Sequence, residues 1–82
     1  MAEPMRHIEI VFLDPFSHTD TGWMPRAKAA DEQPEECLLS GYLIGETQVQ
    51  YVVAGMVHRG DDEVSMVSYV PKGCVVEIRD LP

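Results

Sequence analysis

The sequence lacks the long apolar runs and the basic surplus that mark membrane proteins and most nucleic-acid binders. No stretch approaches the ~18–20 apolar residues that span a bilayer, and the first residues contain no apolar core of a secretory signal. Lysine and arginine number 6 against 14 acidic residues, so the formal net charge is −8. Such a charge repels nucleic acid and anionic membranes at long range. We therefore expect a cytoplasmic protein that binds neither of them directly.

Cysteine is also scarce, and the potential metal ligands are scattered along the chain. Cys37 and Cys74 have no CxxC spacing, and in a reducing compartment we expect both thiols to be reduced, buried and unbridged. His7, His18 and His58 are not paired with each other or with a cysteine at a short zinc-ligand spacing. No metal site and no cofactor are expected.

What the sequence contains is the alternation typical of β-strands. Its 82 residues, 45% of them hydrophobic, fit one globular domain over 1–82. The stretch 37–57 is rich in β-branched, aromatic and aliphatic residues that alternate with small or polar ones. A reversal is predicted at Gly45-Glu46-Thr47, and Ile8, Ile10 and Phe12 are predicted to share one face. The predicted strands of this all-β fold are 7–13, 37–44, 48–58, 63–70 and 74–79.

A long connection, residues 14–36, separates the first predicted strand from the rest. At most one short helix is expected in it, within residues 25–33, with proline at its first position. A single 3₁₀ turn is expected at Pro71-Lys72-Gly73. A loop of this length in a domain of this size is usually functional or packed by its own side chains.

The predicted order of elements resembles that of the SH3-like and Sm-like small barrels. In those folds a long first loop precedes a three-strand meander, and a 3₁₀ turn separates the last two strands. The resemblance implies a five-stranded barrel with open edges at residues 63–70 and 74–79. Because open edges pair readily and a domain this small has a marginal core, we expect a homo-oligomer.

A second resemblance is to short, mostly uncharacterised proteins encoded by bacteriophages and prophages. Their shared layout is, in order, a strand, the dipeptides SH and GW, a cysteine, the tripeptide G(Y/F)L, a second strand and a proline. The residues that carry it here are Asp14, Ser17, His18, Gly22, Trp23, Cys37, Gly41, Tyr42, Leu43, Pro71, Val76 and Ile78. This resemblance implies a phage accessory or counter-defence protein, and it implies no activity.

The segment Ser17-His18-Thr19-Asp20 contains the residue types of a hydrolase, but neighbours in one loop rarely reach triad geometry. No Gly-rich phosphate loop and no diagnostic carboxylate pair is present. We therefore expect a protein that is not an enzyme and has no catalytic residues.

The single tryptophan, Trp23, lies in the long loop and has two interpretations. It closes the open end of the barrel as a hydrophobic plug, or it is an exposed anchor for a partner or a ligand base. The plug is favoured, because tryptophan is highly buried on average.

Two functions are consistent with the sequence. In the first, Ser17, His18, Trp23 and Arg26 bind and sequester a small anionic, nucleotide-type signalling ligand, with the ring stacking on a base and the guanidinium on a phosphate. In the alternative, the chain uses its acidic surface to bind a host protein as an inhibitor or adaptor. In one version of this alternative, the acidic side chains imitate the phosphates of a nucleic acid. Sequestration requires basic and aromatic side chains that converge in a cavity, whereas inhibition requires an exposed patch.

Overall fold

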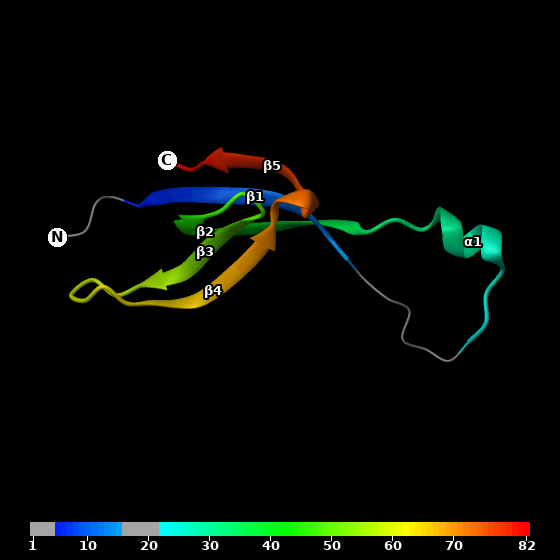
Figure 1. Cartoon of the computed structure of the whole chain (residues 1–82), viewed down its shortest axis with the longest axis horizontal. Coiled ribbons are helices and arrows are strands. Elements are labelled where there is room, and N and C mark those ends of the chain that lie inside the picture. The colour runs from blue at the N-terminus through cyan, green and yellow to red at the C-terminus, as the bar shows by residue number, and fades with distance from the viewer. Residues whose placement is uncertain (1–4, 16–21) are drawn as a thin grey trace.

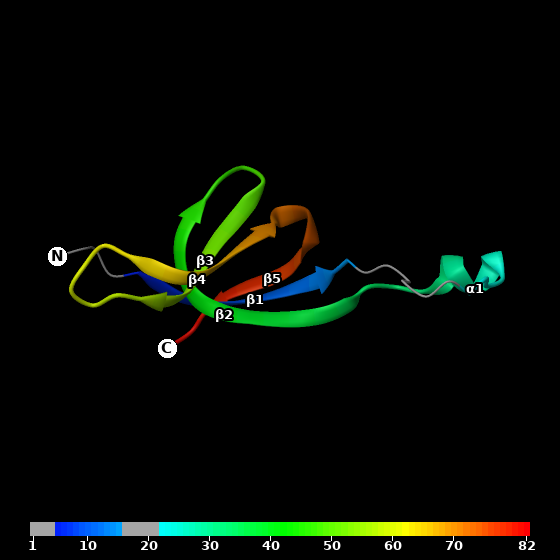
Figure 2. The ribbon, with the colours of Figure 1, turned by 90° about the horizontal axis from the view of Figure 1, so that it is seen from below.

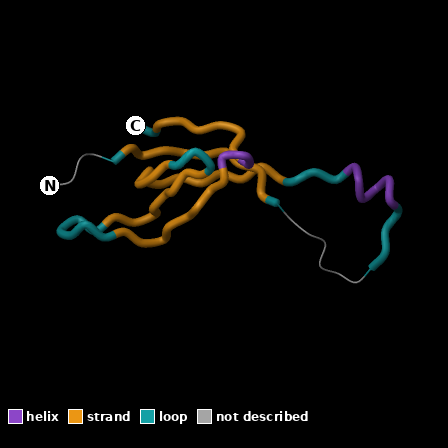
Figure 3. Tube along the Cα trace, viewed as in Figure 1, coloured by secondary structure: helices purple, strands orange, loops and turns teal. Residues whose placement is uncertain are grey.

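The fold is a single antiparallel β-sheet with one short helix, seen in a computed structural model that describes residues 5–15 and 22–82 (Figure 1). The elements in order are β1 (Arg6–Asp14), α1 (Arg26–Asp31), β2 (Glu35–Glu46), β3 (Gln50–Val57), β4 (Val64–Pro71), the 3₁₀ turn η1 (Lys72–Cys74) and β5 (Val75–Asp80). Strands dominate the described chain (Figure 3). The predicted all-β class is confirmed, as are the short helix and the 3₁₀ turn before the last strand.

The strands lie in the order β4-β3-β2-β1-β5, so β4 and β5 are the two edges of the sheet. β2 is the longest strand and curves strongly across the sheet (Figure 2). The register of β2 against β3 shifts between Leu43 and Gly45, and a bulge of this kind bends and twists a strand. No pairing joins β4 to β5 in the described residues, so closure of the sheet into a barrel is not confirmed.

The hydrophobic core is a cluster of side chains from β1, β3 and β4. Ile8 and Ile10 of β1 are fully buried, and they pack with Val53 of β3 and Val70 of β4. Phe12 is partly buried against the same cluster, so the predicted shared face of the first strand is confirmed. β1 occupies this position because it pairs with β2 on one side and with β5 on the other.

The predicted reversal at Gly45-Glu46-Thr47 is too early in the sequence. β2 continues to Glu46, and the turn occupies the residues between it and β3. The hydroxyl of Thr47 accepts hydrogen bonds from the backbone N–H groups of Val49 and Gln50, at 3.2 and 3.1 Å. A side-chain acceptor therefore closes this turn, and Gly45, which has no positive φ, lies in the bulge.

Both cysteines are free, as predicted, but neither is fully buried. Cys37 lies in β2, whereas Cys74 ends the 3₁₀ turn instead of starting the last strand. The half-buried positions reflect the open sheet, which leaves the end of the core nearest η1 accessible.

Candidate functional site

The residues proposed from the sequence to hold a ligand are not gathered into a cavity by the described chain. Ser17 and His18 lie outside the described residues. Trp23 is 100% exposed, and Arg26 begins α1 with its side chain in solvent. The plug interpretation of Trp23 is wrong for this conformation, because the connection carries α1 away from the sheet (Figure 1) and leaves the ring nothing to pack against.

Three of the basic side chains are held in ion pairs that fasten the sheet. Arg6 Nε donates to Asp80 Oδ1 at 2.8 Å, and Arg79 pairs with Glu9, so both contacts join β5 to β1. Lys72 Nζ donates to Glu46 at 2.6 Å and lies 4.9 Å from the centre of the Tyr51 ring. These cations already have acidic partners, which makes them poor candidates for binding a phosphate.

The Arg6 pair gives a prediction about pH. The hydrogen bond from Arg6, followed by its positive charge, lowers the pKa of Asp80. The pair therefore stabilises the fold above the unfolded pKa of about 3.9, and this contribution is lost as pH falls through the lowered folded value. We expect Asp80→Asn to lower the thermal midpoint modestly at about pH 6, and we expect the difference from the parent to shrink as pH falls below the unfolded pKa of about 3.9. Asp62→Asn is the control, and a difference that persists in acid would contradict the charge-based explanation.

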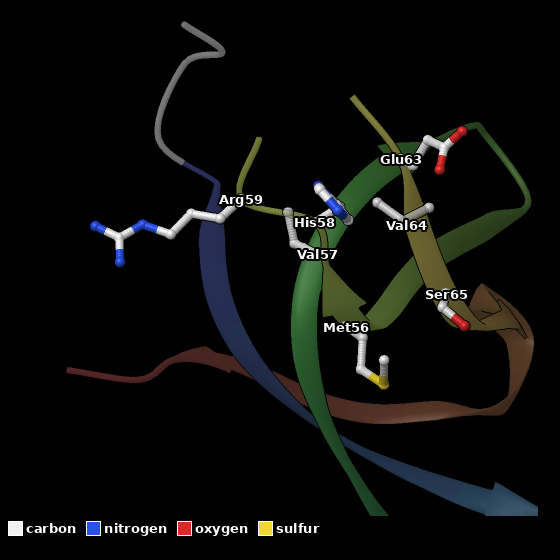
Figure 4. A pocket seen from close by; sticks show the side chains of 7 residues that line it. All are labelled: Met56, Val57, His58, Arg59, Glu63, Val64 and Ser65. Carbon is white, nitrogen blue, oxygen red and sulfur yellow. The ribbon is translucent and has the colours of Figure 1, made fainter. Parts of the chain in front are cut away.

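A groove lies at the end of the β3–β4 hairpin. It has a volume of about 350 Å³, and we call it the hairpin groove. Its lining residues are Met56, Val57, His58, Arg59, Glu63, Val64 and Ser65 (Figure 4). In the close view His58 and Val64 approach each other between the two strands, and the guanidinium of Arg59 extends away from them. The lining therefore combines apolar side chains, from both strands, with polar and charged ones.

The loop that closes this hairpin is organised by His58. Its Nδ1 accepts hydrogen bonds from the backbone N–H groups of Gly60 and Asp61, at 3.0 and 3.1 Å. Its own backbone N–H donates to the carbonyl of Glu63 at 2.9 Å. Because Nδ1 is the acceptor, the imidazole carries its proton on Nε2. These hydrogen bonds fix the backbone of the loop that carries Asp61 and Asp62.

Apolar side chains beside the hairpin groove are exposed to solvent to an unusual extent. Met56 is 55% exposed, Val64 39% and Met66 71%. Met66 has a φ of 55°, a left-handed conformation that is uncommon for residues other than glycine. Gly55 lies opposite, where an added Cβ would be 3.2 Å from that of Met66. Strained backbone of this kind is concentrated at functional sites.

A second cavity, of about 300 Å³, lies where β1 and β4 end, and we call it the end cavity. Its lining residues are Phe12, Leu13, Asp14, Pro15, Leu39, Ser68, Tyr69, Val70, Pro71 and Cys74. Most of these side chains are apolar, and Asp14 is the one formal charge among them. Neither this cavity nor the hairpin groove is lined by Trp23 or Arg26.

Comparison with known proteins leaves the fold and the two cavities as the basis for any functional inference. No protein-family model, no curated protein and no solved structure matches the chain. Within the described residues, no helix has the length and apolar character to cross a membrane. The same residues contain no group of three or more histidine, cysteine or acidic side chains placed to hold a metal ion.

Sequence reasoning missed both cavities, including the hairpin groove beside the acidic cluster of Asp61, Asp62 and Glu63. The missing signal was the position of Met56 and Val64 relative to this cluster. The strand register pairs Val57 with Val64 and Met56 with Ser65, and a single sequence does not reveal that register. Neither side chain is distinguished from a core residue by its type alone.

Proposed function

We propose that the chain is a non-enzymatic protein-binding inhibitor or adaptor that holds a segment of another protein in the hairpin groove. The observation that carries this proposal is the exposure of Met56 and Val64 in a groove of about 350 Å³ with Glu63 at its rim. Exposed apolar side chains surrounded by polar residues are typical of protein interaction sites.

The chemistry of the groove indicates the kind of segment that would fit. Methionine is flexible and polarizable, so Met56 in the groove lining can adapt to a partner's apolar side chain. Asp61, Asp62 and Glu63 are exposed beside it and favour a positively charged neighbour. The expected partner segment therefore carries an aliphatic or aromatic residue flanked by lysine or arginine.

The net charge of −8 supports this choice over an anionic ligand. Acidic proteins attract basic segments and repel phosphates at long range. Sequestration of a nucleotide-type ligand by Ser17, His18, Trp23 and Arg26 stays a prediction, and it would need a site that the described chain does not form alone. Because the chain resembles phage-encoded proteins, we place the partner among host proteins. The role of the chain would then be counter-defence, with nucleic-acid mimicry as one way to achieve it.

The test is binding to an array of peptides that vary one apolar position and its flanking charges. We expect binding to peptides that combine an aromatic or aliphatic residue with flanking lysine or arginine, and weaker binding as salt rises. Met56→Lys and Glu63→Lys should each reduce the affinity at least about 10-fold, since each places a like charge against the peptide.

Two controls make this experiment decisive. Glu77→Lys makes the same charge change on β5, outside the lining of the groove, and should leave binding unchanged. The same protein is titrated with cyclic di- and trinucleotides and cyclic ADP-ribose-type molecules. Nucleotide binding that depends on Trp23 and Arg26, without peptide binding, would reject the adaptor in favour of sequestration. Peptide binding that tolerates both groove substitutions would reject the hairpin groove.

A further inference from the structure

Trp23 and the end cavity are complementary features of the same molecule. Trp23 is completely exposed, although an aromatic side chain of this kind buries about 150–250 Å² in folded proteins. It belongs to the connection between β1 and β2, the arm, of which residues 22–34 are described after Pro15. The arm makes the molecule elongated, with extents of 57 × 23 × 23 Å.

The end cavity has the size and lining that an indole ring requires. An apolar cavity of about 150 Å³ in another protein holds a benzene ring, whereas this one measures about 300 Å³. Phe12 and Leu39 contribute apolar surface from β1 and β2, and Tyr69 and Val70 contribute it from β4. Cys74 lines the cavity as well, which places a thiol next to any bound ring.

Charges near the ring and near the cavity are also complementary. Arg26 and Lys28 follow Trp23 on α1, and neither forms an ion pair with another described residue. Asp14 lines the cavity and pairs in register with Glu35, so the mouth of the cavity is acidic. Arg26 begins α1, whereas Lys28 lies in the last turn of the helix together with Asp31.

The geometry of the arm favours a cavity on another molecule. The antiparallel pairing of β1 with β2 continues to Asp14 and Glu35, so both ends of the arm leave the sheet together. α1 lies beyond this point and away from the sheet in both views (Figures 1 and 2). The arm therefore leaves Trp23 fully exposed, without contact to its own sheet.

We propose that two copies of the chain exchange arms, and that Trp23 of each copy fills the end cavity of the other beside Cys74. In this arrangement Arg26 lies against the acidic mouth formed by Asp14 and Glu35 of the second copy. A reciprocal exchange uses the same two surfaces on both molecules, so it closes at a dimer. It is independent of the proposed function, because the hairpin groove lies at the opposite end of the sheet (Figure 1).

The first test is a cross-link that reports which molecule supplies the cavity. Gly22→Cys, which keeps Trp23, is prepared in a Cys37→Ser background, so that Cys74 is the one native thiol left, and the protein is oxidised mildly with the disulfide-exchange reagent oxidised glutathione. We expect a disulfide-linked dimer on a non-reducing gel, with position 22 joined to Cys74 by peptide mass. The control Asp62→Cys, an exposed position in the hairpin loop, should give no link to Cys74. A link within one chain, or no link to Cys74, would overturn the exchange.

The second test measures association in the protein with both native cysteines. Analytical ultracentrifugation should find a dimer. Its dissociation constant should rise at least about 30-fold in Trp23→Ala, which is the loss of affinity expected when a central interface anchor is truncated. Trp23→Phe should retain most of the affinity, and Val76→Ala, an exposed position on β5, should match the parent. Because Trp23 is the only tryptophan, its emission should shift to longer wavelength on dilution. A monomer at micromolar concentration, or a dimer that tolerates Trp23→Ala, would refute the proposal.

Discussion

Gly41→Ala should destabilise the protein by about 3 kcal/mol, which is a large part of the total stability of a domain of this size. A Cβ built at this position would lie 2.6 Å from the carbonyl oxygen of Ala54 and 2.8 Å from a methyl group of Val53. The carbonyl belongs to the backbone of β3, and Val53 is in the core, so neither atom can withdraw without moving the sheet. Urea titration followed by circular dichroism measures the loss.

Gly45→Ala is the matched control, because both glycines lie in β2 and neither has a positive φ. Its added Cβ would meet the side chain of Val52 at 3.5 Å, which is an ordinary van der Waals contact. We expect a change of less than about 1 kcal/mol, of either sign, since alanine also restricts the unfolded chain. Equal losses at the two positions would show that close backbone approach is not the reason for glycine at position 41.

The second large effect is expected at the centre of the core, where Ile10→Ala should cost about 2–5 kcal/mol. Ile10 is fully buried, and its strand partners are Leu39 on one side and Ile78 on the other. A domain of this size is stable by only about 4–12 kcal/mol in total. The substitution therefore removes a large part of the stability, which calorimetry or urea unfolding would detect.

Val76→Ala provides the comparison, because it also shortens an aliphatic side chain in the same sheet but at a position 53% exposed. It should change the free energy of unfolding by less than about 1 kcal/mol. If Ile10→Ala were as mild as this control, β1 would not be the centre of the core.

The sequence was sufficient to predict the number of strands and most of their positions. Alternation marks β1 clearly, because Ile8 and Ile10 are buried on one side of the strand and a side chain points to that side at every second residue. The turn between β2 and β3 was misplaced, because glycine is a strong turn signal and Gly45 precedes the residue that closes the turn, Thr47. A bulge and a turn both favour glycine, so composition alone does not distinguish them.

The candidate sites were less predictable, because they depend on which residues the fold leaves exposed. Tryptophan is buried on average, and that average favoured the plug. Trp23 is instead fully exposed, because it lies in the arm that leaves the sheet. The hairpin groove arises from the pairing of Val57 with Val64, which places the last residue of β3 opposite the first residue of β4. Side chains gathered by pairing across a sheet have no fixed spacing in the sequence.

The left-handed backbone of Met66 has a consequence for the solubility of the protein. β4 is an edge strand, and a long straight edge offers a template on which other chains can add as strands and form fibrils. The reversal of φ at Met66 divides this edge into two short pieces, and the pairing with β3 is interrupted opposite it at Gly55. Neither piece presents the regular row of N–H and C=O groups that an added strand needs. The edge can therefore display methionine and tyrosine to a partner while resisting uncontrolled assembly of its own copies at high concentration.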